Sequence, residues 1–241
     1  ATASACPCCG PVETPLSYGV ARSSDLAIGE SLTEAVANRQ GQRRQSFSLL
    51  SRILPTSSGR KAISIEPAVP PVEAAVETTF SGTALLLNLP AVGWTARAAD
   101  EMFIGYTLQI PPLKQQIFKD KNRLEWFVKW LDHPNHAISK DAYAEFALAP
   151  FQEVRDSAHA FSQADVIDHL RDLSLQQQRR GFYGMVAGVL ARQSPKESQS
   201  TYTNALIRIV TEHQSNDFQV GLDGVIGGLF IALGERALPI L

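Results

Sequence analysis

All three cysteines of the 241-residue chain lie in one short segment, ACPCCGPVET, at Cys6, Cys8 and Cys9. Three thiolates this close could converge on one soft metal ion, Cu(I) or Zn(II), although ligands so near in sequence rarely complete a site alone. Cys6 and Cys9 also have the C-x-x-C spacing of redox sites. Such a motif normally begins a helix after a strand, whereas this one opens the chain and is followed by Pro11, which disfavours a redox enzyme.

The same three cysteines allow only one internal disulfide. A Cys8–Cys9 bridge would be a strained vicinal ring, and a Cys6–Cys8 bridge would also be tight. One thiol is left over in either case. We expect it to join another chain through an intermolecular disulfide, to bind a metal or to stay free.

The histidines do not have the spacing of a metal site. His133 and His136 flank the HPNH turn and could share a metal, but no third ligand is near them in sequence. His159 and His169 show no zinc spacing either. Since the nucleophile, metalloprotease and phosphate-loop motifs are absent as well, the sequence predicts no enzyme and no cofactor.

Two acidic residues lie one helical turn apart, at Asp141 and Glu145. They could form a carboxylate pair, but pairing with Arg179 or Arg180 of a following helix is favoured. The sequence therefore predicts a structural clamp of these four residues, in which loss of Asp141 lowers stability without affecting a ligand.

Two apolar surfaces are candidates for contact with another protein. Trp126 and Trp130 lie four positions apart, off the main apolar stripe of their helix, where they either seal a domain junction or form a binding hot spot. The very apolar last helix has no following element in the sequence. We expect either that further helices follow Leu241 in the intact protein or that Leu222, Ile226 and Phe230 meet a partner.

The elements that would position these residues change in character near residue 112. Residues 1–112 are rich in Pro, Ser, Thr and Val, and they contain short apolar runs that predict strands at 25–32, 46–54, 62–65 and 83–89. Residues 66–77 are predicted to form a loop, and 95–109 fit a strand or a helix equally well. This half is expected to be a small antiparallel β domain, a barrel or a sandwich.

Residues 113–241 have helical periodicity and predict helices over 122–134, 138–150, 162–172, 175–193, 197–213 and 218–235. With an offset of about 40 residues, Ala144, Gly184 and Gly224 coincide, as expected for a two-helix repeat. A plain helical bundle is the alternative. We predict an α+β fold in which the β domain precedes a HEAT- or armadillo-like α-helical repeat array of about three helix pairs. Glycine costs stability inside helices, so close packing must offset it.

The segments RLEWFVKWLDHPNHAISKDAYAEFALAPFQEVR (123–155) and RRGFYGMVAGVL (179–190), with Cys6-Pro7-Cys8, resemble secreted bacterial proteins that contain HEAT-like repeats. The resemblance implies a small β domain that opens with a CPxC segment after a signal peptide, followed by a helical array. It implies an architecture and no activity. Cys9 departs from the two-cysteine pattern.

Composition limits the classes of function. The net charge is −2, and 44% of the residues are hydrophobic, which is a globular balance without the basic excess of a nucleic-acid-binding protein. No apolar run is long enough for a transmembrane segment. The small residues ATASA resemble the end of a signal peptide, so we expect an exported protein, periplasmic or extracellular, with the signal peptide removed.

Together these features predict a non-catalytic exported scaffold or protein-binding module, a subunit of a larger envelope or extracellular assembly with other protein chains as partners. The alternative is a thiol-redox or soft-metal-binding protein that uses Cys6, Cys8 and Cys9. A metal assay with thiol titration would distinguish the two.

Overall fold

The structure is a computed structural model that describes residues 14–39, 41–56, 59–65, 69–113, 122–172, 175, 177–212 and 221–241. The cysteine segment lies outside these residues. Contacts divide the chain into two units: a barrel unit, residues 14–117 with 133–141, and a helical unit, residues 118–132 with 142–241. Each unit is described by itself.

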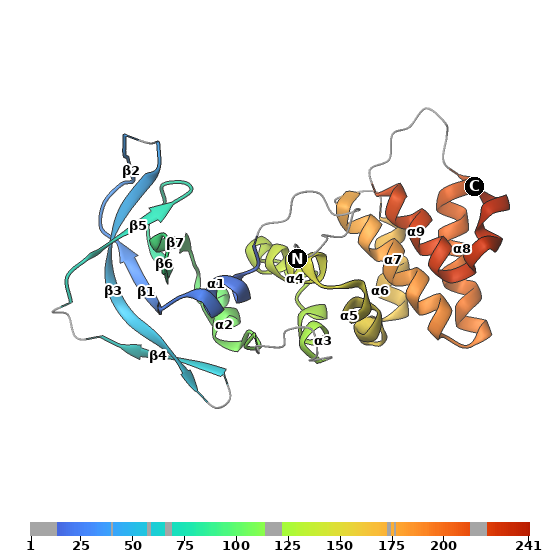
Figure 1. The fold of residues 1–241 in the computed structure, drawn as a ribbon, viewed down its shortest axis with the longest axis horizontal. Helices are drawn as coiled ribbons and strands as arrows, with labels where there is room; N and C mark the ends of the chain where they lie inside the picture. Colours follow the sequence, from blue (N-terminus) through green and yellow to red (C-terminus); the bar gives the residue numbers. More distant parts are fainter. Residues whose placement is uncertain are drawn as a thin grey trace. The chain divides into compact units, whose positions relative to one another are not determined.

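The barrel unit is built on strands β1 to β7 (Figure 1). Their bounds are β1 Asp25–Ser31, β2 Val36–Ala37, β3 Arg43–Thr56, β4 Gly59–Ser64, β5 Val72–Val76, β6 Thr83–Leu89 and β7 Gly93–Ala98. Five of them, in the order β1–β6–β7–β5–β3, close into a barrel because β3 also pairs with β1. Strands β2 and β4 are additions that pair with β3.

This topology corrects the predicted β domain in one respect. The domain is a barrel and not a sandwich, but it is not purely antiparallel, since β5 and β7 pair in parallel with Ala75 opposite Thr95. The Greek-key path of the five closed strands resembles that of OB-type barrels. Fold alone carries no activity, so this likeness assigns no function.

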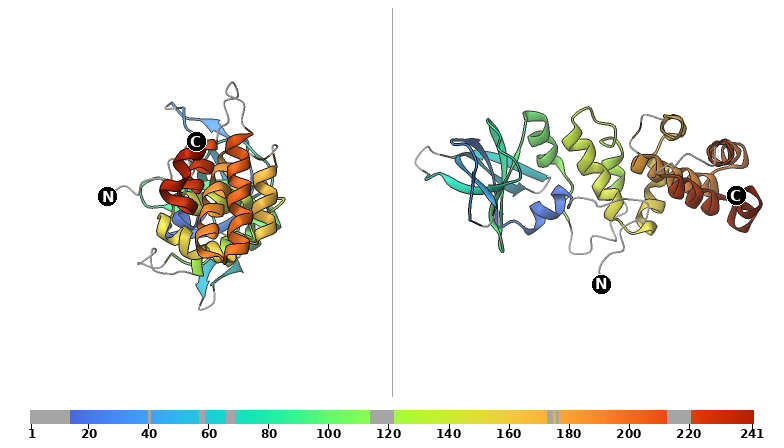
Figure 2. Two further views of the ribbon diagram at one scale, coloured as in Figure 1. Left: turned by 90° about the vertical axis from the view of Figure 1, so that its right-hand side faces the viewer. Right: turned by 90° about the horizontal axis from the view of Figure 1, so that it is seen from above.

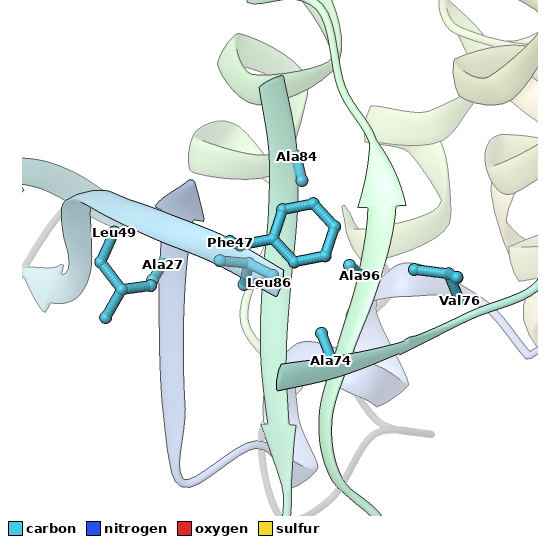
Figure 3. Packing of buried hydrophobic residues seen from close by; sticks show 8 residues of the cluster. All are labelled: Ala27, Phe47, Leu49, Ala74, Val76, Ala84, Leu86 and Ala96. Carbon is cyan, nitrogen blue, oxygen red and sulfur yellow. The ribbon is translucent and has the colours of Figure 1, made fainter. Parts of the chain in front are cut away.

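The barrel encloses a core of buried small and large side chains. The Phe47 ring, which is fully buried, points toward Ala84, Ala96 and Leu86 (Figure 3). A bulge between Ile28 and Gly29 lets β1 bend and pair on both sides. The period-two prediction for residues 46–54 is confirmed, because every second residue from Phe47 to Ile53 faces inward except Ser51.

The structure decides two predictions about secondary structure in the barrel unit. The ambiguous segment 95–109 contains both elements: strand β7, and then helix α2, Glu101–Gln109, whose N-terminus is capped by the Asp100 side chain. The predicted loop 66–77 is wrong over 72–76, where β5 buries Ala74 and Val76 in the core. Helix α1, Leu16–Arg22, was not predicted.

The helical unit contains α3 to α9 apart from the first part of α4. The bounds are α3 Asn122–Val128, α4 His136–Leu148, α5 Phe151–Ser157, η2 Ala158–Ala160, α6 Gln163–Arg171, α7 Gln177–Gln193, α8 Lys196–Thr211, α9 Leu222–Leu233 and η3 Gly234–Ile240. The last three α-helices lie side by side (Figures 1 and 2). No helix of the described residues has the length and hydrophobicity needed to cross a bilayer.

The predicted HEAT- or armadillo-like repeat array is wrong, although the α+β class holds. The helices aligned as first members of each pair, α3, α6 and α8, have 7, 9 and 16 residues, and α5 with η2 is inserted before α6. The interfaces also differ. Helix α7 meets α9 through glycines, but it meets α4 through ring contacts of Phe182 with Tyr143 and Phe146. A solenoid repeats one interface between neighbours, and these helices do not.

The glycines themselves pack as expected between α7 and α9. A Cβ on Gly184 would lie 2.7 Å from the Cα of Val225, and a Cβ on Gly181 would lie 3.2 Å from the Cα of Gly221. The backbones therefore approach as closely as missing side chains allow. Gly227 is an exception, because nothing lies within 4 Å of its hypothetical Cβ.

Candidate functional site

The second half of β3 and the following strand β4 form a hairpin with an exposed outer surface. Arg52 lies opposite Ile63, and Leu54 lies opposite Lys61, so these side chains share one side of the hairpin. Large apolar side chains are well exposed there: Leu50 is 44%, Leu54 is 43% and Ile63 is 46% exposed. We call Leu50, Arg52, Leu54, Lys61 and Ile63 the hairpin face.

The opposite side of the hairpin packs against the rest of the barrel unit. Ile53 lies opposite Ala62 and is only 4% exposed. Arg60 donates from its guanidinium to the carbonyl oxygen of Ile110 at 2.8 Å, just beyond the end of α2. Its pKa is lowered by burial. The hairpin is thus anchored on one side and leaves its apolar and basic side to solvent.

A second candidate lies in the helical unit around His169 of α6. The Nε2 atom of His169 lies 2.8 Å from Oδ1 of Asp132, and its Nδ1 atom lies 2.5 Å from the carbonyl oxygen of Asp165. Both partners are acceptors, so the doubly protonated imidazolium satisfies both contacts. The hydrogen bond to Asp132 raises the pKa of His169 and burial opposes it.

Tyr183 of α7 completes this cluster. Its ring stacks on His169 with centroids 4.2 Å apart, and its hydroxyl lies 3.4 Å from Oδ1 of Asp132. Burial raises the pKa of the Tyr183 hydroxyl, and the Asp132 charge adds to this. We call Asp132, His169 and Tyr183 the His169 cluster.

A pocket of about 370 Å³ borders the His169 cluster. Asp132 and Tyr183 line it, together with Phe161, Asp165 and the N-cap residue of α6, Ser162. The Ser162 hydroxyl accepts from the Asp165 amide and is used as a helix cap. Since both nitrogens of His169 already have partners, the imidazole would have to break a bond before it could take a proton from a substrate. The hydrogen bonds of the His169 cluster therefore fit a structural role better than acid–base catalysis.

The four residues of the predicted clamp occupy different settings. Asp141 accepts from the backbone N–H of Leu16 at 2.6 Å and from the Tyr106 hydroxyl at 2.7 Å, all within the barrel unit. In the helical unit, Glu145 forms a buried ion pair with Arg123.

The two arginines of the clamp lie at the start of α7. Arg179 donates to the carbonyl oxygen of Leu131 at 3.0 Å and lies over the Tyr143 ring. Burial lowers the pKa of Arg180. These contacts leave the clamp a prediction.

The predicted partner surfaces are partly covered. Trp126 and Trp130 are half-buried with ring centroids 5.4 Å apart, and the ammonium of Lys129 lies 5.2 and 5.0 Å from their rings. On α9, Leu222 and Ile226 are half-buried and Phe230 is 37% exposed.

The proposed metal site at Cys6, Cys8 and Cys9 lies outside the described residues. Within the part of the chain that the structure describes, no group of three or more His, Cys, Asp or Glu side chains could hold a metal.

Sequence reasoning missed both candidate sites. The hairpin face carried a signal in SFSLLSRIL, where Leu50 and Leu54 fall on the opposite side of the strand from Phe47, Leu49 and Ile53. Only one side of a strand in a small barrel faces the core. A strand that is apolar on both sides therefore exposes one apolar side. The His169 cluster carried no such signal, because its members lie 37 and 51 residues apart along the chain.

Comparison with models of known protein families, with curated proteins and with solved structures finds no match to this chain. The resemblance to secreted bacterial proteins with HEAT-like repeats therefore stays a prediction.

Proposed function

We propose that this chain is a non-catalytic protein-binding module, a subunit of a larger assembly, and that it contacts a partner protein through the hairpin face. One observation carries the proposal: Leu50, Leu54 and Ile63 are each more than 40% exposed and lie together on two paired strands. Single exposed apolar residues are ordinary on protein surfaces, whereas a contiguous group marks an interaction site.

The setting of the hairpin face supports the same proposal. The hairpin is held from behind by Ile53 and by the Arg60 hydrogen bond to Ile110, so its surface is presented in a fixed form. A preformed surface loses little conformational entropy on binding. Neither Lys61 nor the three apolar residues contribute to the barrel core, which leaves them available for a partner.

The His169 cluster supports the non-catalytic part of the proposal. The groups that could act as acid or base there, His169 and Tyr183, bond to Asp132 and to the Asp165 carbonyl oxygen. These bonds connect the turn after α3 with α6 and α7. Such connections stabilise the fold, which is a structural role.

Site-specific photo-cross-linking in cells that naturally make the protein tests the proposal. A benzophenone amino acid is placed at position 63, and the matched control carries it at Arg97, which is exposed on β7 of the same barrel. We expect one discrete cross-linked product from position 63 and none from position 97. Absence of a product from position 63, or the same products from both positions, would refute a binding role for the hairpin face.

A further inference from the structure

Strand β4 has one edge that pairs with β3 and a second edge that no strand of the described residues occupies. Ile65 donates its backbone N–H to Leu50 at 3.0 Å. Along an antiparallel ladder, hydrogen-bonded residue pairs alternate with pairs that are not hydrogen-bonded. Every second residue before Ile65, which means Ile63 and Lys61, therefore also directs its backbone N–H and C=O groups toward β3. The N–H and C=O groups of Ala62 and Ser64 then point to the other edge.

An unoccupied strand edge is a template for one more strand, and proteins commonly protect such edges. Here the edge borders the hairpin face, which displays Leu54 and Ile63 at 43% and 46% exposure. An added strand would gain backbone hydrogen bonds from the edge and apolar contacts from the face. This combination is the basis of peptide recognition by strand addition.

The charge of the strand limits what can be added. The segment GRKAISI, residues 59–65, carries Arg60 and Lys61 and no acidic residue. On the neighbouring strand Arg52 lies 3.5 Å from Asp25 and is still 54% exposed at its side chain. Acidic side chains on the hairpin-face side of an added strand would complement Lys61 and Arg52, and basic ones would be repelled.

A second copy of this chain is the other occupant that the edge allows. Pairing β4 with the β4 of another copy would gather two Lys61 and two Arg52 side chains around a small apolar face without adding acidic groups to that strand. Like charges close together oppose such pairing. The charge balance favours a different protein over self-association.

We propose that the free edge of β4 binds an extended segment of a partner protein by adding it to the sheet as a further strand. Every second residue of this segment is alternately apolar and acidic, so that both kinds of side chain lie on the same side of the sheet as the hairpin face. The inference rests on the proposed function and specifies its partner. Apolar side chains of the segment would cover Leu54 and Ile63, and its carboxylates would reach Lys61 and Arg52.

The test uses the full chain and a blocked octapeptide of sequence Val-Ser-Glu-Ser-Val-Ser-Glu-Ser, in which valine and glutamate lie on the same side of the extended chain. Binding is followed by fluorescence anisotropy. We expect saturable binding that weakens about tenfold in Lys61→Gln, as expected for loss of one complementary charge, and does not change in Arg97→Gln. A peptide with lysine in place of glutamate should not bind. Equal binding of the two peptides would overturn the charge assignment.

Backbone methylation separates strand addition from simple adhesion. Only alternate N–H groups of an added strand face β4, so N-methylation of one alternate set should abolish binding and methylation of the other set should not. Ala62→Pro removes an edge donor without removing a bond to β3, and should abolish binding with the fold intact by circular dichroism. Loss with both methylated peptides, or with neither, would contradict strand addition.

Two outcomes keep this inference separate from the proposed function. If cross-linking from position 63 succeeds and the octapeptide does not bind, the binding role stands and strand addition is refuted. If sedimentation shows that the chain dimerises and that Ala62→Pro abolishes the dimer, the occupant is a second copy and the acidic segment is refuted.

Discussion

His169 and Asp132 are joined by a hydrogen bond of 2.8 Å, while the other ring nitrogen of His169 lies 2.5 Å from the Asp165 carbonyl oxygen. A neutral imidazole has one N–H and can donate to one of these acceptors at a time. The folded chain therefore favours the imidazolium, and the pKa of His169 is raised above its ordinary value of 6.5. Lys129, Glu125 and Asp165 are the other charged groups around the adjoining pocket.

The raised pKa of His169 makes its contribution to stability depend on pH. Because the folded state binds the proton more tightly than the unfolded state, the stabilisation is complete below the unfolded pKa and is lost as pH rises through the folded pKa. We expect His169→Gln to lower the free energy of unfolding by about 1 kcal/mol at pH 5.5, a modest value because Asp132 is half exposed, and by less at pH 8.5. Urea unfolding of both proteins at the two pH values measures this. An equal loss at both values would show that the imidazolium has no role.

The close approach of α7 and α9 predicts opposite effects for two glycine substitutions. Gly184→Ala places a methyl group 2.7 Å from the Cα of Val225, so we expect a loss of about 2 kcal/mol in unfolding free energy. The matched control is Gly227→Ala, where the new methyl group meets nothing within 4 Å. Alanine favours the helix there and should raise stability by up to about 1 kcal/mol. Thermal unfolding of the two variants measures the difference, and equal effects would contradict the packing described.

Asp141 connects two donors within the barrel unit, the Leu16 amide and the Tyr106 hydroxyl. Asp141→Ala leaves both buried donors without this acceptor, and we expect a loss of about 3 kcal/mol in unfolding free energy. Tyr106→Phe removes one of the two bonds and should cost about 1 kcal/mol. In a double-mutant cycle the combined variant should lose less than the sum, since one bond is counted twice. Strict additivity would mean that the Tyr106–Asp141 bond contributes nothing.

Local signals in the sequence predict several elements of this fold. The alternation from Phe47 to Ile53 and the apolar run of residues 83–89 give strands β3 and β6, and Ser162 marks the start of α6 through its capping hydrogen bond to Asp165. These signals are read from residues near one another in the chain. Strand β5 was missed because Pro70 and Pro71 precede it and its alternating pattern is only five residues long.

Relations between distant segments could not be predicted in the same way. The spacing of Gly184 and Gly224 correctly indicates close packing between two helices, but it also suggested a repeat that is absent, because α4 meets α7 through Phe182 and not through small residues. Parallel pairing of β5 with β7 depends on barrel closure, which no single segment encodes. The exposure of Ile63 likewise depends on how β4 pairs with β3, which no single segment of the sequence specifies.

The alternation of backbone groups along β4 offers the most direct test of the binding account. Amide hydrogen exchange of the isotope-labelled chain is measured by NMR with and without the valine–glutamate octapeptide. We predict that the amides of Ala62 and Ser64, which face the free edge, are slowed by the peptide, while that of Ile63, which faces β3, does not change. Uniform protection along residues 60–64, or protection confined to α9 or to the His169 cluster, would contradict the account.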